Sequence, residues 1–327
     1  VSIMFFVIYG PSAALRTHDG RLLQISVIFS KAGRLSPKNC HICSRRGAYR
    51  PGTRRMGRKF SKYHGAGNDF VMIDGRTEPF DATPERVAAL CRRRTGIGAD
   101  GLMILESDLA EEFRMRYFNA DGGEATMCGN GGRCIALFAH HLGIGGMRKR
   151  FIGVDGPHTA ELLRVEGPEG EIRLGMIDVR RVEVHPEYLF LDTGSPHYVE
   201  FVESVRGVDV AGRGAAIRHS AAFAARVEIV SDSHIRIRTF ERGVEAETLA
   251  CGTGATASAI AAAVRTGSPC RDYRVDVEGG TLRVAFEPDG KGGFTRIELT
   301  GPARKVFEGE FADDFRRDGE PEFPKKS

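Results

Sequence analysis

The sequence predicts an α+β fold of two pseudo-symmetric domains, each a mixed sheet wrapped around a central helix, with the active site in the cleft between them. Two observations predict this fold. A Cys-Gly-x-Gly turn followed by a helical run of small residues occurs twice, at Cys128 and 123 residues later at Cys251. Short apolar segments with strand-like alternation fill most of the remaining chain, so the halves share one plan rich in strands.

A turn followed by a strand opens each half. Gly65-Ala66-Gly67-Asn68 precedes an apolar run in the first half, and Thr193-Gly194-Ser195-Pro196 precedes another in the second. Further strands are predicted at 102–105, 113–118, 172–177, 227–230, 235–240, 281–286 and 295–299. The helices predicted are 84–93, 133–142 and 255–265.

Composition indicates a soluble globular protein with room for two cores. The chain has 327 residues, of which 41% are hydrophobic and 28% charged. No apolar run reaches the roughly 18 to 20 residues that span a bilayer, so no membrane association is predicted. From residue 56 onward the chain holds 37 basic and 42 acidic side chains, and this mildly acidic body argues against nucleic-acid binding.

The first 55 residues differ in character, with ten Lys and Arg side chains and one acidic residue. One interpretation is an organelle transit peptide. The favoured interpretation is an extension upstream of a true start at Met56. In both cases this segment is expected to be disordered. The expected domains are therefore a leader at 1–55, a first domain at 56–177 plus 301–315, a second at 178–300, and a tail at 316–327.

The seven cysteines do not suggest a disulfide framework or a metal site. Cys40-His41-Ile42-Cys43 has metal-ligand spacing, but no second pair follows it. Three others, at Cys91, Cys134 and Cys270, read as small buried hydrophobic side chains. Cys128 and Cys251 differ, because glycine turns and helix N-termini present backbone N–H groups that stabilise a thiolate and bind a carboxylate.

From about Met56 to Gly309 the chain resembles the diaminopimelate epimerase family. The resemblance rests on six motifs in the same order, followed by a similar closing strand at Leu299-Thr300-Gly301-Pro302-Ala303. The motifs are Lys62-Tyr63-His64-Gly65-Ala66-Gly67-Asn68-Asp69-Phe70, Arg94-Thr95-Gly96-Ile97-Gly98-Ala99-Asp100, Phe118-Asn119-Ala120-Asp121-Gly122, Cys128-Gly129-Asn130-Gly131, Glu241-Arg242-Gly243, and Glu247-Thr248-Leu249-Ala250-Cys251-Gly252-Thr253-Gly254.

The resemblance implies a cofactor-independent isomerase that interconverts LL- and meso-diaminopimelate on the route to lysine and peptidoglycan. Inversion of a carbon needs a base on one face and an acid on the other, and a thiolate and a thiol meet that need. The resemblance implies that Cys128 and Cys251 are this pair, each able to take either role. No phosphate-binding glycine loop or pyridoxal-phosphate lysine setting is recognisable. A cytoplasmic homodimer is also implied.

The resemblance also assigns supporting residues. His197 and Glu241 match the pair that tunes the cysteine pKa values, and Arg242 suits the distal carboxylate of the substrate. The positions that match substrate-binding residues are Asn68, Asn119, Gly129, Asn130, Glu241, Arg242, Gly252 and Thr253. Three departures stand out: Ser195 replaces a usual Asn, Gly101 replaces a frequent Gln, and Arg226-Val227-Glu228-Ile229 follows a shortening near Phe223 where the family has a substrate-binding Asn.

Two rival functions remain open. A two-cysteine racemase or epimerase of the proline or hydroxyproline type would share the fold. Such an enzyme would not need to recognise a distal amino-acid group, so the presence of Asn68, Asn119 and Arg242 argues against it. A thiol-redox protein or non-catalytic binding protein is the alternative from another class. The two retained Cys-Gly-x-Gly turns argue against a non-catalytic relative, and the lack of Cys-x-x-Cys in the body argues against a redox protein.

Overall fold

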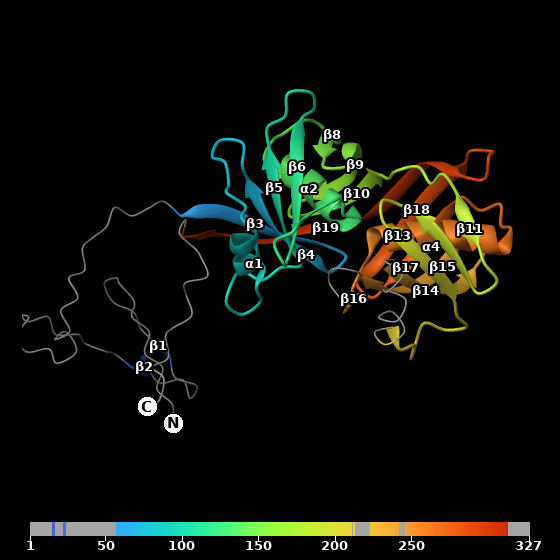
Figure 1. Ribbon diagram of the computed structural model, residues 1–327. Coiled ribbons are helices and arrows are strands. Elements are labelled where there is room, and N and C mark those ends of the chain that lie inside the picture. Colours follow the sequence, from blue (N-terminus) through green and yellow to red (C-terminus); the bar gives the residue numbers. More distant parts are fainter. Residues whose placement is uncertain are drawn as a thin grey trace, which may run out of the picture. The chain divides into compact units, whose positions relative to one another are not determined.

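The computed structural model describes residues 57–210, 212, 223–241 and 246–312, and two short pieces at 15–16 and 22–23 (Figure 1). The chain divides into two units, residues 1–54 and 55–327. In the first unit β1 (Leu15–Arg16) and β2 (Leu22–Leu23) pair antiparallel. The rest of the predicted leader, including the Cys40–Cys43 segment, and most of the predicted tail lie outside the described residues.

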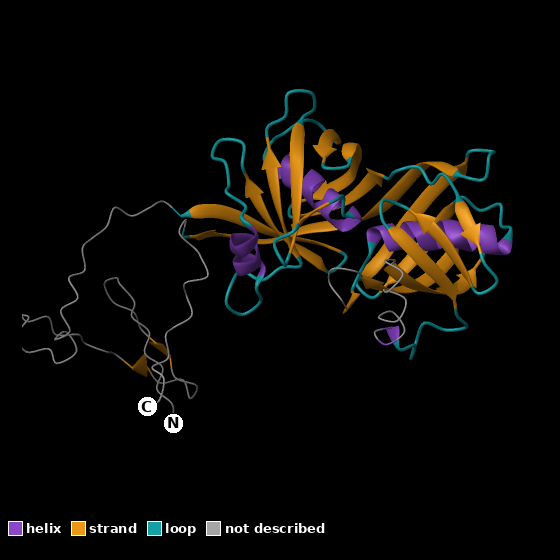
Figure 2. Cartoon of the chain, in the orientation of Figure 1, coloured by secondary structure: helices purple, strands orange, loops and turns teal. Residues whose placement is uncertain are grey.

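The first half of the larger unit is a ring of strands around one helix. Strands β19, β3, β4, β5, β6, β8, β9 and β10 pair in that order, and β10 returns to β19. The helix α2 lies against the strands of this ring (Figure 2). Its apolar side chains form one core cluster with those of the strands. The elements are β3 (Arg58–Gly65), β4 (Asn68–Asp74), α1 (Pro84–Cys91), β5 (Gly101–Glu106), β6 (Phe113–Asn119), β7 (Glu124–Ala125), α2 (Gly129–His141), β8 (Arg148–Gly153), β9 (Gly156–Glu166) and β10 (Glu169–Gly175).

The second half repeats this arrangement around α4, whose alanine-rich surface is buried on nearly every side. Small side chains let the surrounding strands approach the helix closely. The elements are β11 (Val182–Val184), β12 (Tyr188–Asp192), β13 (Pro196–Phe201), β14 (Phe223–Ser231), β15 (His234–Glu241), β16 (Ala246–Thr248), α4 (Gly252–Thr266), β17 (Asp272–Val277), β18 (Gly280–Pro288) and β19 (Phe294–Phe311).

The pairing directions show that the two halves have the same topology. From β3 to β10 the successive pairs are antiparallel, parallel, antiparallel, parallel, antiparallel and antiparallel. From β12 to β19 the same six directions recur in the same order. Each central helix follows a short strand, β7 or β16, that pairs with the strand before it in the chain. The predicted pair of pseudo-symmetric mixed-sheet halves is therefore confirmed.

One long strand belongs to both halves. The first part of β19 pairs with β18, its middle with β10, and its last part with β3. Its side chains contribute to both cores, since Leu299 packs in the cluster around α4 and Ala303 in the cluster around α2. The closing strand 299–303 predicted from the resemblance thus returns the chain to the first half.

The predicted strands all coincide with observed ones, although 172–177 runs two residues past the end of β10. The two helices after the cysteines begin earlier than predicted, at Gly129 and at Gly252. Their glycines form the first helical turn instead of a turn before the helix. No helix among the described residues is long and apolar enough to cross a membrane. In the same residues no three His, Cys, Asp or Glu side chains form a group that could hold a metal.

Candidate active site

The two cysteines occupy equivalent positions at the beginning of the two central helices. Cys128 is the N-cap residue of α2 and Cys251 the N-cap residue of α4, both with extended backbone. The first turn of each helix has backbone N–H groups without intrahelical acceptors, and the helix dipole places partial positive charge there. Each sulfur therefore lies where a negative charge is stabilised.

The first turns of the two helices touch through glycine. A methyl group on Gly252 would lie 3.0 Å from the Cα atom of Gly129 and 2.9 Å from Cδ2 of Leu299. A methyl group on Gly129 would lie 3.2 Å from the Cα atom of Gly252. These distances are shorter than ordinary carbon contacts, so the absence of a side chain at both positions allows the helix ends to approach. This packing accounts for the Gly that follows each cysteine.

Cys251 is buried among hydrogen-bonding groups of its own half. Its sulfur accepts a bond from the Gly254 N–H at 3.3 Å and lies 3.4 Å from Oγ1 of Thr253. His197 Nε2 lies 3.9 Å from the sulfur. The other ring nitrogen, Nδ1, lies 2.7 Å from the Ser195 carbonyl and must be the protonated one to donate there. Nε2 is then the acceptor nitrogen, and it faces both the Cys251 sulfur and Oγ1 of Thr253, the latter at 3.5 Å.

Burial lowers the pKa of His197 to about 4, although the bond to the Ser195 carbonyl favours the charged form. The imidazole is consequently neutral at physiological pH. It can accept a hydrogen bond from the Cys251 thiol through Nε2, but it does not provide a permanent positive charge beside the sulfur. The structure thus places His197, one of the two predicted tuning residues, beside Cys251.

Cys128 faces an amide group held in one orientation. Its sulfur lies 3.7 Å from Oδ1 of Asn68. The Nδ2 group of Asn68 donates to Asp100 Oδ2 at 2.8 Å. The Nδ2 group of Asn130 donates to Asn68 Oδ1 at 3.3 Å and to the Ala250 carbonyl, next to Cys251, at 2.7 Å. Asn130 therefore joins the surroundings of both cysteines.

A charged network supports Asn68 from behind. Arg93 contacts Asp69 and Asp100 at 2.7 Å each, and the buried Lys62 contacts Asp69 at 2.8 Å. Burial opposes ionisation of Asp69, but the hydrogen bonds from Arg93 and Lys62 lower the pKa of this carboxyl group. Asp100, which lies in one of the six motifs, also lines the cavity, although it was not predicted as a site residue.

A cavity of about 190 Å³ is lined by both Cys128 and Cys251. Of the predicted site residues, its lining includes Asn68, Asn119, Cys128, Gly129, Asn130, Cys251, Gly252 and Thr253. Ser195, one of the departures from the family pattern, also lines it. His197 lies behind Cys251. Arg242 lies outside the described residues, and only the backbone of Glu241 is described.

Phe223 is a further site residue that was not predicted from the sequence. It lines the cavity and stacks on His197 with ring centroids 5.1 Å apart. The only signal was the apparent shortening of the chain around it. Arg226, which was expected to stand where a substrate-binding Asn is usual, does not line the cavity. Its buried side chain forms an ion pair with Glu200 at 3.3 Å.

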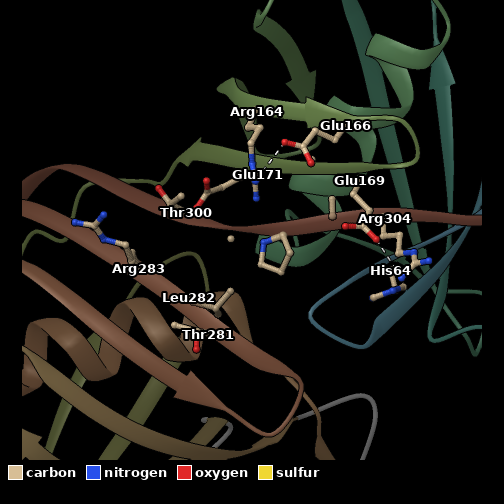
Figure 3. Close-up of a pocket in the computed structure, with 14 residues that line it drawn as sticks. His64, Arg164, Glu166, Glu169, Glu171, Thr281, Leu282, Arg283, Thr300 and Arg304 are labelled. Carbon is tan, nitrogen blue, oxygen red and sulfur yellow. Dashed lines mark hydrogen bonds and ion pairs between the residues drawn. The ribbon is translucent and has the colours of Figure 1, made fainter.

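A second cavity, of about 430 Å³, lies along β9, β10, β18 and β19 (Figure 3). Neither cysteine lines it. Four of its charged side chains are paired with one another, since Arg164 contacts Glu166 at 3.3 Å and Arg304 contacts Glu169 at 3.1 Å. The smaller cavity is therefore the one that combines nucleophilic and acid-base groups.

A family model for diaminopimelate epimerase matches residues 60–179 and 189–306. The chain belongs to the diaminopimelate epimerase family. Proteins named diaminopimelate epimerase from Flavobacterium psychrophilum and Chlorobaculum tepidum are 44% identical to it over 257 and 262 residues. These alignments cover 76% and 75% of this chain and 98% of each relative.

Solved structures with the same fold are more distant in sequence. A probable proline racemase from Agrobacterium radiobacter is 14% identical with a TM-score of 0.61, and it covers 78% of this chain and 93% of its own. A hydroxyproline epimerase from Agrobacterium vitis is 12% identical with a TM-score of 0.62, covering 79% and 93%. These likenesses show the shared fold, whereas membership of the diaminopimelate epimerase family follows from the sequence matches.

Proposed function

We propose that this protein interconverts LL- and meso-diaminopimelate by moving one proton off and another onto the α-carbon, with Cys128 and Cys251 as base and acid. The observation that carries the proposal is the pair of N-cap cysteines on two helices whose first turns touch. Both cysteines line one cavity, and every described member of the predicted substrate-binding set surrounds them except Glu241, of which only the backbone is described.

The reaction needs one sulfur on each face of the α-carbon, roughly 3 to 3.5 Å from it. The thiolate removes the α-proton, the other thiol gives its proton to the opposite face, and the charges on the two sulfurs exchange. Since the roles exchange with direction, either cysteine serves as base. Free N–H groups in both first turns would bind the substrate carboxylate and stabilise the carbanion that forms beside it.

The remaining groups have secondary roles in this proposal. His197 stays neutral and tunes Cys251, because its Nε2 can accept a hydrogen bond from the thiol form of that cysteine. Asn68, Asn119, Asn130 and Thr253 bind the substrate. Glu241 tunes the cysteine pair, and Arg242 binds the distal carboxylate, as the family resemblance implies. No cofactor is required for these steps.

The test is incubation with LL-diaminopimelate in deuterated water, followed by chiral separation and mass analysis. Deuterium should appear at the inverted α-carbon. Cys128→Ala and Cys251→Ala should each lower the rate on the order of 10² to 10⁴-fold, whereas Cys270→Ala should stay within a few fold. Equal losses in all three variants would contradict the two-cysteine assignment. Inversion of proline in place of diaminopimelate would support the rival racemase function.

We further propose a homodimer in the cytoplasm, with domains divided at 177/178 and 300/301 and a leader before Met56. The family resemblance supports these points. Mass measurement by light scattering at several concentrations tests the dimer, because a monomer mass throughout would contradict it.

A further inference from the structure

Arg133 is a fully buried cation whose role neither the sequence motifs nor the proposed mechanism explains. It lies in the second turn of α2, five residues after Cys128, and its exposed fraction is 0%. Among the described residues no carboxylate lies within ion-pair distance of its guanidinium. A buried charge without a counter-ion is destabilising, so its position calls for a reason beyond packing.

The neighbouring chain makes room for this guanidinium. A methyl group on Gly301 of β19 would lie 3.2 Å from Nε of Arg133, and one on Gly65 would lie 3.4 Å from Nη2. Nη1 donates to the Gly129 carbonyl at 3.1 Å. Nε lies 3.4 Å from the Pro302 carbonyl. Arg133 is thus held by carbonyl oxygens and glycines, not by an opposite charge.

The contact with Asn130 determines how that amide is oriented. Nη2 of Arg133 donates to Oδ1 of Asn130 at 2.8 Å. A reversed amide would turn its NH₂ group toward the guanidinium, where both groups are donors. The observed orientation directs the Asn130 NH₂ group to the Ala250 carbonyl and to Oδ1 of Asn68. The residue before Cys251 and the amide facing Cys128 therefore both depend on Arg133.

The charge itself also acts on the site. Burial lowers the pKa of the Arg133 guanidinium, while the thiols of Cys134 and Cys128 act in the opposite direction. The side chain stays protonated because an arginine guanidinium does not lose its proton in proteins. Its positive charge lies behind the first turn of α2, where it adds to the helix dipole in a region of low dielectric.

We propose that Arg133 is a positioning and electrostatic residue of the epimerisation. It fixes the Asn130 amide that links the two helix ends, and it stabilises the negative charge that alternates between sulfur and substrate. This inference rests on the proposed two-cysteine function. The competing explanation is that Arg133 only fastens α2 to β19.

The test compares Arg133→Met, Arg133→Lys and, as a matched control, Lys149→Met. Lys149 is also a buried cation of the first half, 1% exposed and bonded to the Ile144 and Gly146 carbonyls, but it is remote from the cavity lining. For each variant we would measure melting temperature, kcat, KM, and the pH dependence of Cys128 alkylation by iodoacetamide without substrate.

Arg133→Met should lower kcat on the order of 10²-fold with KM changed only a few fold. The alkylation of Cys128 should require a pH about one unit higher than in the wild type. Arg133→Lys keeps the charge, so it should restore the alkylation profile but only part of kcat. Lys149→Met should lower melting temperature without moving the profile.

The proposal would be overturned if Arg133→Met left the pH dependence of Cys128 alkylation unchanged and lost activity only in proportion to its lower melting temperature. If Arg133→Met does not fold, Arg133→Lys decides, because wild-type kcat in that variant would exclude the positioning role. The alkylation measurement needs no substrate. A wild type that fails to turn over diaminopimelate would therefore refute the proposed function separately from the role of Arg133.

Discussion

Replacing Gly252 by Ala tests whether the contact of the helix ends sets the distance between the catalytic sulfurs. The added methyl group would lie 3.0 Å from the Cα atom of Gly129. Ordinary carbon contacts require about 3.5 to 4.0 Å, so the two helix ends must separate by about 0.5 to 1 Å. A displacement of this size in a reacting pair costs on the order of 10 to 10²-fold in kcat.

The folding cost should be much smaller than the catalytic cost. Overpacking destabilises by about 1 to 3 kcal/mol, while Ala in place of Gly favours a helix by about 1 kcal/mol. The net loss of roughly 0 to 2 kcal/mol corresponds to a few degrees in melting temperature for a chain of this size. Gly252→Ala should therefore be folded but slow.

The assay is the initial rate of LL-diaminopimelate inversion at saturating substrate, with melting temperature measured on the same samples. Gly146→Ala is the matched control, because a methyl group there meets no atom within 4 Å. The control should keep the wild-type rate. A wild-type kcat in Gly252→Ala would refute the idea that the close approach of the helices positions the cysteines.

Three further outcomes are expected. Because burial lowers the folded-state pKa of His197 to about 4, below roughly 6.5 in the unfolded chain, its stabilising effect is complete above pH 6.5 and is lost as the pH falls toward 4. Urea unfolding at several pH values measures the free energy of unfolding. Between pH 6.5 and 4 this free energy should fall by about 3 kcal/mol less in His197→Gln than in the wild type. A mild two-electron oxidant should inactivate the enzyme by a Cys128–Cys251 disulfide that thiol reductant reverses and substrate prevents; oxidative loss of activity with both cysteines unlinked on peptide mapping would contradict it. A chain that begins at Met56 should match the full chain in turnover and melting temperature, and aggregation of the shorter chain would show that the preceding residues contribute contacts.

The sequence was most informative where a local pattern repeats. The two Cys-Gly-x-Gly turns predicted both the duplicated plan and the residues around the cavity, because a helix start and a tight glycine contact are encoded within a few residues. The beginning of α2 and of α4 was misplaced for the same reason. Glycine usually weakens helices, and only the packing of Gly129 against Gly252 explains its presence inside the first turn.

Long-range partners were beyond sequence reasoning. Arg133 appears as one more basic residue in a helix, and nothing nearby indicates that its guanidinium would be buried against Asn130 and Pro302. The place of Phe223 depends on how a shortened segment joins β14, which brings its ring onto His197. The family resemblance aligned Arg226 with the segment that usually carries a substrate-binding Asn, whereas strand pairing places it opposite Glu200, with which it forms an ion pair.

The shared strand β19 has a consequence for how this protein folds during synthesis. Residues 294–311 form β19, which is the strand that pairs with β18, with β10 and with β3. The ribosome makes these residues near the end, so the first ring stays open, with two unpaired edges, while the whole second half is being made. The first half is therefore the part that depends on chaperone protection, and stop codons before residue 294 should leave it aggregation-prone although nearly all of its own sequence is present.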